Sequence, residues 1–376
     1  MRGCLPTILA NAIVVITILF SAANSMAQTG QKGNSDANKA VAVDERGTLH
    51  LPPLDIPLSE FLSPEARRIS DYFRLLSSAS RHAKNGSPYN AEFDRYFQSA
   101  LKRTLRLYPV STTDVTIAGV RAREVLPKDG VSEENRRRVL IELHGGGFRG
   151  GWDLIDKMEA APVASIGRIK VVSVNYREGP QFKFPSASED VAAVYKELLK
   201  SYPAENIGLY GASAGGVLAA EAVAWFRDEH LPKPGAIGIL SASAGGWAGG
   251  DSTYLSQPLM GMAPVDPKSF KHPEVFNVPD TAYFTDADFK DPLVAPIVSP
   301  SLLAQFPPTL IMTSTRAADM SPAVYSHAQL VKQGVDAELH VWDGLPHAFY
   351  VSEPDYPESR DAWDVVVKFF NTHLHK

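Results

Sequence analysis

The chain has 376 residues, of which 44% are hydrophobic and 21% charged, so it can bury one large α/β core or two smaller ones. Its formal net charge is -5 without long runs of one sign, which excludes the basic footprint of a nucleic-acid-binding protein. The only cysteine, Cys4, lies at the very start. If the first residues are removed, the mature protein has no disulfide, cysteine nucleophile or cysteine-ligated metal.

The first 27 residues predict a secretory signal peptide. Arg2 supplies positive charge, an apolar run covers residues 5–20, and residues 25–27 (Ser-Met-Ala) are suited to cleavage after Ala27. An uncleaved membrane anchor is the alternative, but the run is shorter than the roughly 20 residues that span a bilayer, and Asn11 interrupts it. We therefore expect an exported protein, periplasmic or secreted, without stable membrane anchoring after cleavage.

Residues 28–56 are predicted to form a flexible leader, because the stretch after the signal is rich in Gly, Ser, Asn, Gln and Lys. Residues 57–108 predict two helices that precede the first strand and could cover one side of a site. The first begins near residues 63–65 (Ser-Pro-Glu). Apolar side chains recur at helical spacing in both, at Ile69, Tyr72, Phe73 and Leu76 and then at Phe93, Tyr96, Phe97, Leu101 and Leu105.

Residues 109–376 predict an α/β domain, because short β-rich runs alternate with helical stretches, as in a mostly parallel sheet flanked by helices. The first two runs, joined across Gly119, predict an antiparallel hairpin at the sheet edge. Eight strands are expected at 114–118, 122–126, 139–143, 171–175, 207–210, 237–241, 309–314 and 338–342. Helices are expected at 154–166, 188–201, 214–228, 322–333 and 359–373. Residues 245–306 break the alternation and predict an insertion that contributes to a cap or pocket.

A Gly-x-Ser-x-Gly sequence, residues 211–215, directly follows one predicted strand and directly precedes a helix. At such a turn the serine backbone is strained, so its neighbours must be small. The turn projects the Ser213 hydroxyl above the strand ends and directs the Ala214 N–H at any oxyanion formed there. A merely structural turn is the alternative. The strand-turn-helix context favours Ser213 as a nucleophile.

A second motif, residues 144–148 (His-Gly-Gly-Gly-Phe), follows the apolar strand 139–143. Successive glycines let backbone N–H groups approach a ligand, as stabilisation of an oxyanion requires. Phosphate binding is the competing interpretation, yet neither a Gly-Lys-Ser/Thr ending nor the dinucleotide-type glycine spacing occurs here. His144 is expected to brace this loop rather than to take part in the chemistry.

A serine nucleophile needs a base and a carboxylate that orients the base. Of ten histidines, His347 lies in the loop after the last predicted strand, as the chain order Ser, acid, His requires. The acid is expected in the loop after strand 309–314, where only Asp319 fits. Asp319 directly precedes a predicted helix, so the alternative is a helix cap.

Together these motifs resemble the bacterial hormone-sensitive-lipase-like family of α/β-hydrolases, of the acetyl esterase or carboxylesterase type. The resemblance runs over residues 139–349. Besides the motifs above, its carriers are Tyr176-Arg177, Phe184-Pro185, Glu189-Asp190 and Asp291-Pro292. The resemblance implies an α/β-hydrolase fold in which the N-terminal helices of residues 57–108, with part of the insertion 245–306, form a helical cap over the acyl pocket. It also implies hydrolysis of short-chain acyl esters through an acyl-enzyme, without metal or organic cofactor.

For the site, the resemblance implies that Ser213 is the nucleophile, His347 the base, and the backbone amides of Gly146, Gly147 and Ala214 the oxyanion donors.

The sequence departs from the family at Ala317, where many relatives carry the acid two positions before Asp319. The triad is therefore either shifted to Asp319 or incomplete. Two alternatives to an esterase stay open at this point: an amide or formamide hydrolase on the same scaffold, and a catalytically silent ligand-binding homologue. The physiological substrate and the oligomeric state are not indicated by the sequence.

Overall fold

The computed structural model describes residues 41–45, 47–82, 91–246, 248–266 and 282–375. The predicted signal peptide, residues 1–27, lies outside the described residues. The chain divides into two units, Met1–Pro57 and Leu58–Lys376. In the first unit, within the predicted leader, strands β1 (Ala42–Val43) and β2 (Leu49–His50) pair antiparallel. None of the helices in the described ranges combines the length and apolar character needed to cross a bilayer.

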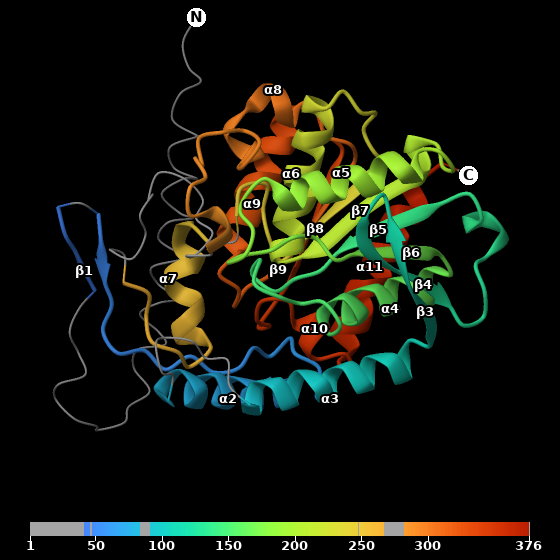
Figure 1. Cartoon of the computed structure of the whole chain (residues 1–376). Coiled ribbons are helices and arrows are strands. Elements are labelled where there is room, and N and C mark those ends of the chain that lie inside the picture. The colour runs from blue at the N-terminus through green and yellow to red at the C-terminus, as the bar shows by residue number, and fades with distance from the viewer. Residues whose placement is uncertain (1–40, 46, 83–90, 247, 267–281, 376) are drawn as a thin grey trace, which may run out of the picture. The chain divides into compact units, whose positions relative to one another are not determined.

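The second unit contains an eight-stranded sheet in the order β10-β9-β8-β7-β5-β6-β4-β3 (Figure 1). All pairings among β5 to β10 are parallel, and β4 pairs antiparallel with both β3 and β6. The strands are β3 (Val110–Ile117), β4 (Val120–Pro127), β5 (Val139–Leu143), β6 (Lys170–Val174), β7 (Ile207–Ala212), β8 (Ala236–Leu240), β9 (Thr309–Ser314) and β10 (Ala337–Trp342). The predicted mostly parallel, eight-stranded α/β fold is confirmed.

The predicted edge hairpin is formed by β3 and β4, in which Ile117 pairs with Val120 across a two-residue turn. Both turn residues have positive φ, 49° at Ala118 and 85° at Gly119. This geometry matches the right-handed twist of the flanking strands. The inner strands β5, β7, β8 and β9 are buried along their whole length, as strands covered on both faces are.

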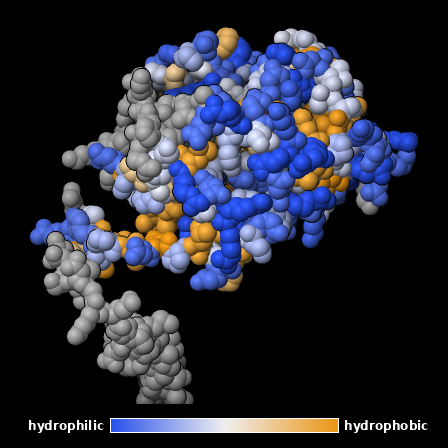
Figure 2. Space-filling model, turned by 90° about the horizontal axis from the view of Figure 1, so that it is seen from below, coloured by the Kyte–Doolittle hydropathy of each residue, from blue (hydrophilic) through white to orange (hydrophobic). Residues whose placement is uncertain are grey.

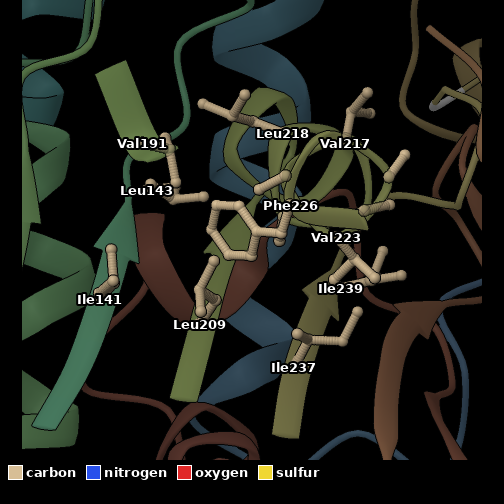
Figure 3. Close-up of a cluster of buried hydrophobic side chains, with 14 of the residues drawn as sticks. Ile141, Leu143, Val191, Leu209, Val217, Leu218, Val223, Phe226, Ile237 and Ile239 are labelled. Atoms are coloured by element: carbon tan, nitrogen blue, oxygen red, sulfur yellow. The ribbon is translucent and has the colours of Figure 1, made fainter. Parts of the chain in front are cut away.

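Helices cover both faces of the sheet (Figure 1). One layer contains α5 (Ser186–Leu198), α6 (Ala214–Asp228) and α9 (Met320–Lys332), and the other contains α4 (Ile155–Gly167) and α11 (Pro357–His373). Figure 3 shows the first layer, where Phe226 of α6 faces Leu209 of β7. Each such buried side chain contributes about 1.5–3 kcal/mol to stability. The core therefore fixes the strand ends on which the site is built.

The two helices predicted at the N-terminus are α2 (Ile69–His82) and α3 (Ala91–Leu107). α2 buries its apolar stripe, and α3 lies against α4. Phe73 of α2 lies 5.6 Å beneath the guanidinium of Arg316, which belongs to the loop after β9. On the face of the molecule in Figure 2 most of the surface is hydrophilic, with apolar residues in separate patches.

The segment 245–306 contains more regular structure than its sequence predicts. It includes α7 (Gly250–Leu259), which packs on α9, and α8 (Pro300–Leu303); residues 247 and 267–281 lie outside the described ranges. α7 buries small polar side chains, among them Ser252 and Ser256, instead of apolar ones. A helix of this kind leaves no apolar period in the sequence.

Candidate active site

The turn formed by residues 211–215, named here the serine turn, joins β7 to α6. Ser213 has φ 57° and ψ -117°, a backbone conformation that non-glycine residues rarely adopt. The Ser213 N–H donates to Leu240 O at 2.9 Å, which ties the turn to β8. A Cβ at Gly211 or Gly215 would lie 2.1 or 1.6 Å from Leu143 O. Only glycine at both positions lets the turn pack against the end of β5.

Residues 144–151, named here the glycine loop, follow β5, the parallel neighbour of β7. Gly146 has φ 129°, and a Cβ there would lie 1.5 Å from Gly150 O. At Gly147, with φ 65°, a Cβ would meet no atom of the described residues within 4 Å. The loop touches the serine turn, since a Cβ at Gly215 would lie 3.0 Å from His144 O. The two glycine-containing motifs predicted as one site therefore adjoin.

His144 is fully buried, and burial lowers its pKa to about 4, so the ring is neutral. Its Nδ1 lies 2.9 Å from Gly145 O, and its ring stacks on Tyr176 at 4.4 Å. The Tyr176 hydroxyl donates to His144 O at 2.5 Å. His144 thus has the bracing contacts expected from the sequence.

His347 lies in the loop between β10 and α10 (Phe349–Ser352), residues 343–348, named here the histidine loop. Its side chain is one-third exposed, at 34%, whereas that of Asp319 is fully buried. His347 Nδ1 lies 2.5 Å from Asp319 Oδ1, and Asp319 Oδ2 accepts a hydrogen bond from Thr313 Oγ1 at 2.6 Å. Because a carboxylate only accepts, Nδ1 carries the proton and Nε2 is left as an acceptor.

Asp319 occupies the N-cap position of α9, but its side chain makes no capping hydrogen bond in the described structure. The helix-cap alternative therefore does not account for this residue. Ala317, at the position where many relatives carry the acid, is fully buried. The loop after β9 is tied to the histidine loop by a hydrogen bond from the Arg316 N–H to Leu345 O at 3.1 Å.

The end of β8 lies between the serine turn and the histidine loop. Leu240 O accepts from the Ser213 N–H, and the next residue, Ser241, accepts the Ala348 N–H on its Oγ at 3.1 Å. Ser241 Oγ also lies 2.9 Å from the hydroxyl of Tyr350. Ser213, Asp319 and His347 thus follow the carboxyl ends of the parallel strands β7, β9 and β10, where sites in α/β sheets are built.

Sequence reasoning missed three residues that hold this site: Ser241, Thr313 and Glu159 of α4. Glu159 accepts hydrogen bonds from the N–H groups of Gly145 and Ala212. Nothing local in the sequence marks any of the three. The aromatic side chains of Tyr283 and Phe284 are buried against Phe148 in the core.

In the described ranges, no three His, Asp, Glu or Cys side chains are grouped as metal ligands would be.

Comparison with known proteins identifies the family. A family model of the alpha/beta hydrolase fold matches residues 140–351. The chain is 26% identical over 320 residues to an acetyl-hydrolase of Streptomyces hygroscopicus, covering 82% of this chain and 97% of the relative. The crystal structure of esterase E25 matches with a TM-score of 0.71 and 25% identity, covering 87% of this chain and 99% of that chain.

An esterase from the bacterial hormone-sensitive lipase family matches with a TM-score of 0.66 and 25% identity, covering 83% of this chain and 99% of the other. The resemblance inferred from the motifs is thereby confirmed. The range matched by the family model includes Ser213, Asp319 and His347. The chain belongs to the α/β-hydrolase fold family and is an enzyme of the hydrolase class.

Proposed function

We propose that this hydrolase cleaves short-chain acyl esters of the acetyl type through a Ser213-His347-Asp319 triad. The observation that carries the proposal is the 2.5 Å contact between His347 Nδ1 and Asp319 Oδ1. It holds the imidazole in the tautomer whose Nε2 accepts a proton. Ser213 stands on the strained turn beside β8, and the Ser241 bond to the histidine loop links the two sides.

In the proposed reaction Ser213 Oγ attacks the ester carbonyl carbon while His347 Nε2 takes the hydroxyl proton. The bond to the leaving alcohol breaks as that proton passes to the alcohol oxygen, which leaves an acyl-enzyme. Water, deprotonated by His347, then attacks the acyl carbon. The bond between that carbon and Ser213 Oγ breaks as the proton passes from His347 to Oγ, which releases the carboxylic acid and restores the enzyme. Buried Asp319 stabilises the imidazolium that forms in both halves of the reaction.

The negative charge on the carbonyl oxygen would be stabilised by the backbone N–H groups of Gly146, Gly147 and Ala214. Two observations support this assignment. The space around the Cα of Gly147 is open among the described residues, and Ala214 is the first residue of α6, whose N-terminal dipole favours an anion.

The acetyl preference rests on the relatives, among which are the acetyl-hydrolase and acetyl esterases of Salmonella. We propose that α2 and α3 form the cap over the acyl group, supported by the contact of Phe73 with Arg316. Amide or formamide hydrolysis is the alternative chemistry on the same apparatus, and a silent binding protein is the alternative without chemistry.

The test compares wild type with Ser213→Ala on p-nitrophenyl esters of increasing acyl length and on matched anilides. We expect the acetyl ester to be hydrolysed fastest and the variant to lose about 10³-fold or more. A fluorophosphonate should label the wild type and leave the variant unlabelled. Faster turnover of the anilides would favour an amidase, and an unlabelled, inert wild type would favour the binding protein.

We also propose that the protein is exported, because residues 1–27 have the charged start, apolar run and small-residue cleavage site of a signal peptide. Expression of the whole chain in a bacterium, fractionation and N-terminal sequencing test this. The expected first residue of the exported form is Gln28. Recovery of uncut chain from the cytoplasm alone would contradict export.

A further inference from the structure

The side-chain carboxyl group of Glu159 forms hydrogen bonds to both the glycine loop and the serine turn of the candidate site. Glu159 on α4 is buried to 1% exposure. Its Oε1 accepts the N–H of Gly145, the first glycine of the glycine loop, at 3.0 Å. Its Oε2 accepts the N–H of Ala212, the residue directly before Ser213, at 3.0 Å. The two oxygens of a single side chain therefore set the spacing between the nucleophile and the loop proposed to bind the oxyanion.

Glu159 is packed closely against the two segments to which it is hydrogen-bonded. An ideal Cβ at Gly145 would lie 3.1 Å from both Glu159 Oε1 and Ala212 O, so the three segments are in close contact. The hydroxyl of Tyr210 on β7 donates to the backbone oxygen of Glu159 at 3.3 Å, which fixes this turn of α4 to the strand that carries the nucleophile. Glu159 is thus held from its backbone as well as from its side chain.

A second buried carboxyl group, that of Glu142 on β5, adjoins Glu159 and accepts a hydrogen bond from the Ser173 hydroxyl at 2.5 Å. Burial raises the pKa of both carboxyls, and two neighbouring anions would repel each other, so the pair retains one proton. Glu159 already accepts two N–H groups, whereas Glu142 Oε1 accepts from no described residue. A proton on Glu142 that is donated to Glu159 satisfies both groups. The other titratable groups that interact electrostatically with Glu159 are Asp156, Tyr176, Tyr210 and Tyr350.

We propose that Glu159, as a carboxylate, is a positioning residue of the hydrolytic site that holds the glycine loop at a fixed distance from Ser213, and that Glu142 carries the proton of the buried pair. This inference rests on the proposed function and adds to it a determinant of geometry that touches neither substrate nor reacting atoms. An amide at position 159 has only one oxygen, so Glu159→Gln would place an NH₂ group against one of the two backbone N–H donors.

The experiment measures kcat and KM of Glu159→Gln on the acetyl ester, per active site titrated with a fluorophosphonate. We expect kcat to fall about 10- to 100-fold, because small misplacement of catalytic groups costs that much, while KM stays within about twofold. Hydrogen exchange of peptides that contain Gly145 and Ala212 should become faster in the variant, since both N–H groups depend on Glu159.

Two isosteric variants serve as controls. In Glu142→Gln the amide still donates to Glu159 and its oxygen still accepts from Ser173, so kcat should stay within about twofold of wild type. Glu221→Gln changes another fully buried glutamate, on α6, whose oxygens accept from no described residue, and should leave kcat unchanged. Thermal unfolding of all three separates lost positioning from lost folding.

The outcomes are distinct. Unchanged kcat in Glu159→Gln with an active wild type would overturn the positioning role alone. A loss in Glu142→Gln as large as in Glu159→Gln would overturn the placement of the proton. A wild type that neither turns over esters nor reacts with the fluorophosphonate would overturn the proposed function and the positioning role together, whatever hydrogen exchange shows.

Discussion

Two regions of the molecule bury a carboxyl group in opposite ways. At the ends of β9 and β10, Asp319 is fully buried, and each of its oxygens has a partner, His347 or Thr313. In the layer that contains α5, α6 and α9, Glu221 of α6 is also fully buried, and neither of its oxygens accepts a hydrogen bond from a described residue. Burial is the same in both regions, and only the partners differ.

The difference in hydrogen-bond partners shows where the fold can accommodate a buried charge. A buried carboxylate costs several kcal/mol unless hydrogen bonds replace its water. Asp319 has those bonds at the place where the proposed reaction creates an imidazolium. Glu221 has none, and burial raises its pKa well above the usual value, so it stays protonated in the folded state. The first region is built for charge and the second for packing.

The largest expected effect comes from removing the charge of Asp319 without changing its shape. Asp319→Asn should lower kcat/KM by about 10³- to 10⁴-fold, because an amide stabilises the wrong histidine tautomer. Steady-state kinetics on the acetyl ester measure this. Ala317→Asp is the matched variant, since it adds the acid at the position that many relatives use. Activity within tenfold of wild type in Asp319→Asn would show that Asp319 is not the acid.

A smaller effect is expected when Asp319 loses its second partner. Thr313→Val keeps the shape of the side chain and leaves Oδ2 without its donor at 2.6 Å. The unsatisfied oxygen should lower stability by about 1–3 kcal/mol, measured by urea denaturation. The reoriented carboxylate should also lower kcat by about tenfold. If stability and kcat are both unchanged, hydrogen-bond partners do not account for the difference between Asp319 and Glu221.

The smallest effect is expected at Glu221, on stability alone. Its raised pKa means that the folded chain keeps a proton that the unfolded chain releases above about pH 4.5, so stability contributed by this group falls as pH rises. Burial also raises the pKa of Glu353 to about 8 and of Glu178 to about 7, which adds to the same trend. Thermal midpoints should therefore be lower at pH 8.5 than at pH 6.

Glu221→Gln replaces the carboxyl group with an amide that does not titrate, so this group no longer makes stability depend on pH. Its midpoint should exceed that of wild type by a few degrees at pH 8.5 and by much less at pH 5, because pH 5 is only just above the pH at which the unfolded chain begins to release the Glu221 proton. Scanning calorimetry at the two pH values measures this. An equal change in the midpoint at both pH values would contradict a protonated Glu221.

Much of the fold could be predicted from the sequence because its signals are local. β5, β9 and α6 begin and end where predicted, since an apolar run or a strand-turn-helix motif marks each of them. α7 was not predicted, because it buries small polar side chains such as that of Ser252, whose Oγ accepts the N–H of Ser321 on α9, 69 positions away in the sequence.

The residues of the candidate site also fall into two groups, those marked by local signals and those placed by partners distant in the sequence. Ser213, His347 and Asp319 were chosen from chain order and from their places at strand ends. Ser241 and Glu159 were missed because their partners, Ala348 and Ala212, lie 107 and 53 positions away in the sequence. Which distant segments meet is decided by the sheet order, and no local pattern encodes that order.

The protonated carboxyls also change how the protein should behave in an electric field. With Glu142 and Glu221 neutral inside the fold, the folded protein carries less negative charge than the formal value of -5. The folded protein should focus at a higher pH than the isoelectric point of 6.1 that its composition implies. In a transverse urea gradient gel, unfolding would add negative charge as these carboxyls lose their protons, while it expands the chain. Electrophoretic mobility thus offers a view of these buried protons that requires neither substrate nor mutation.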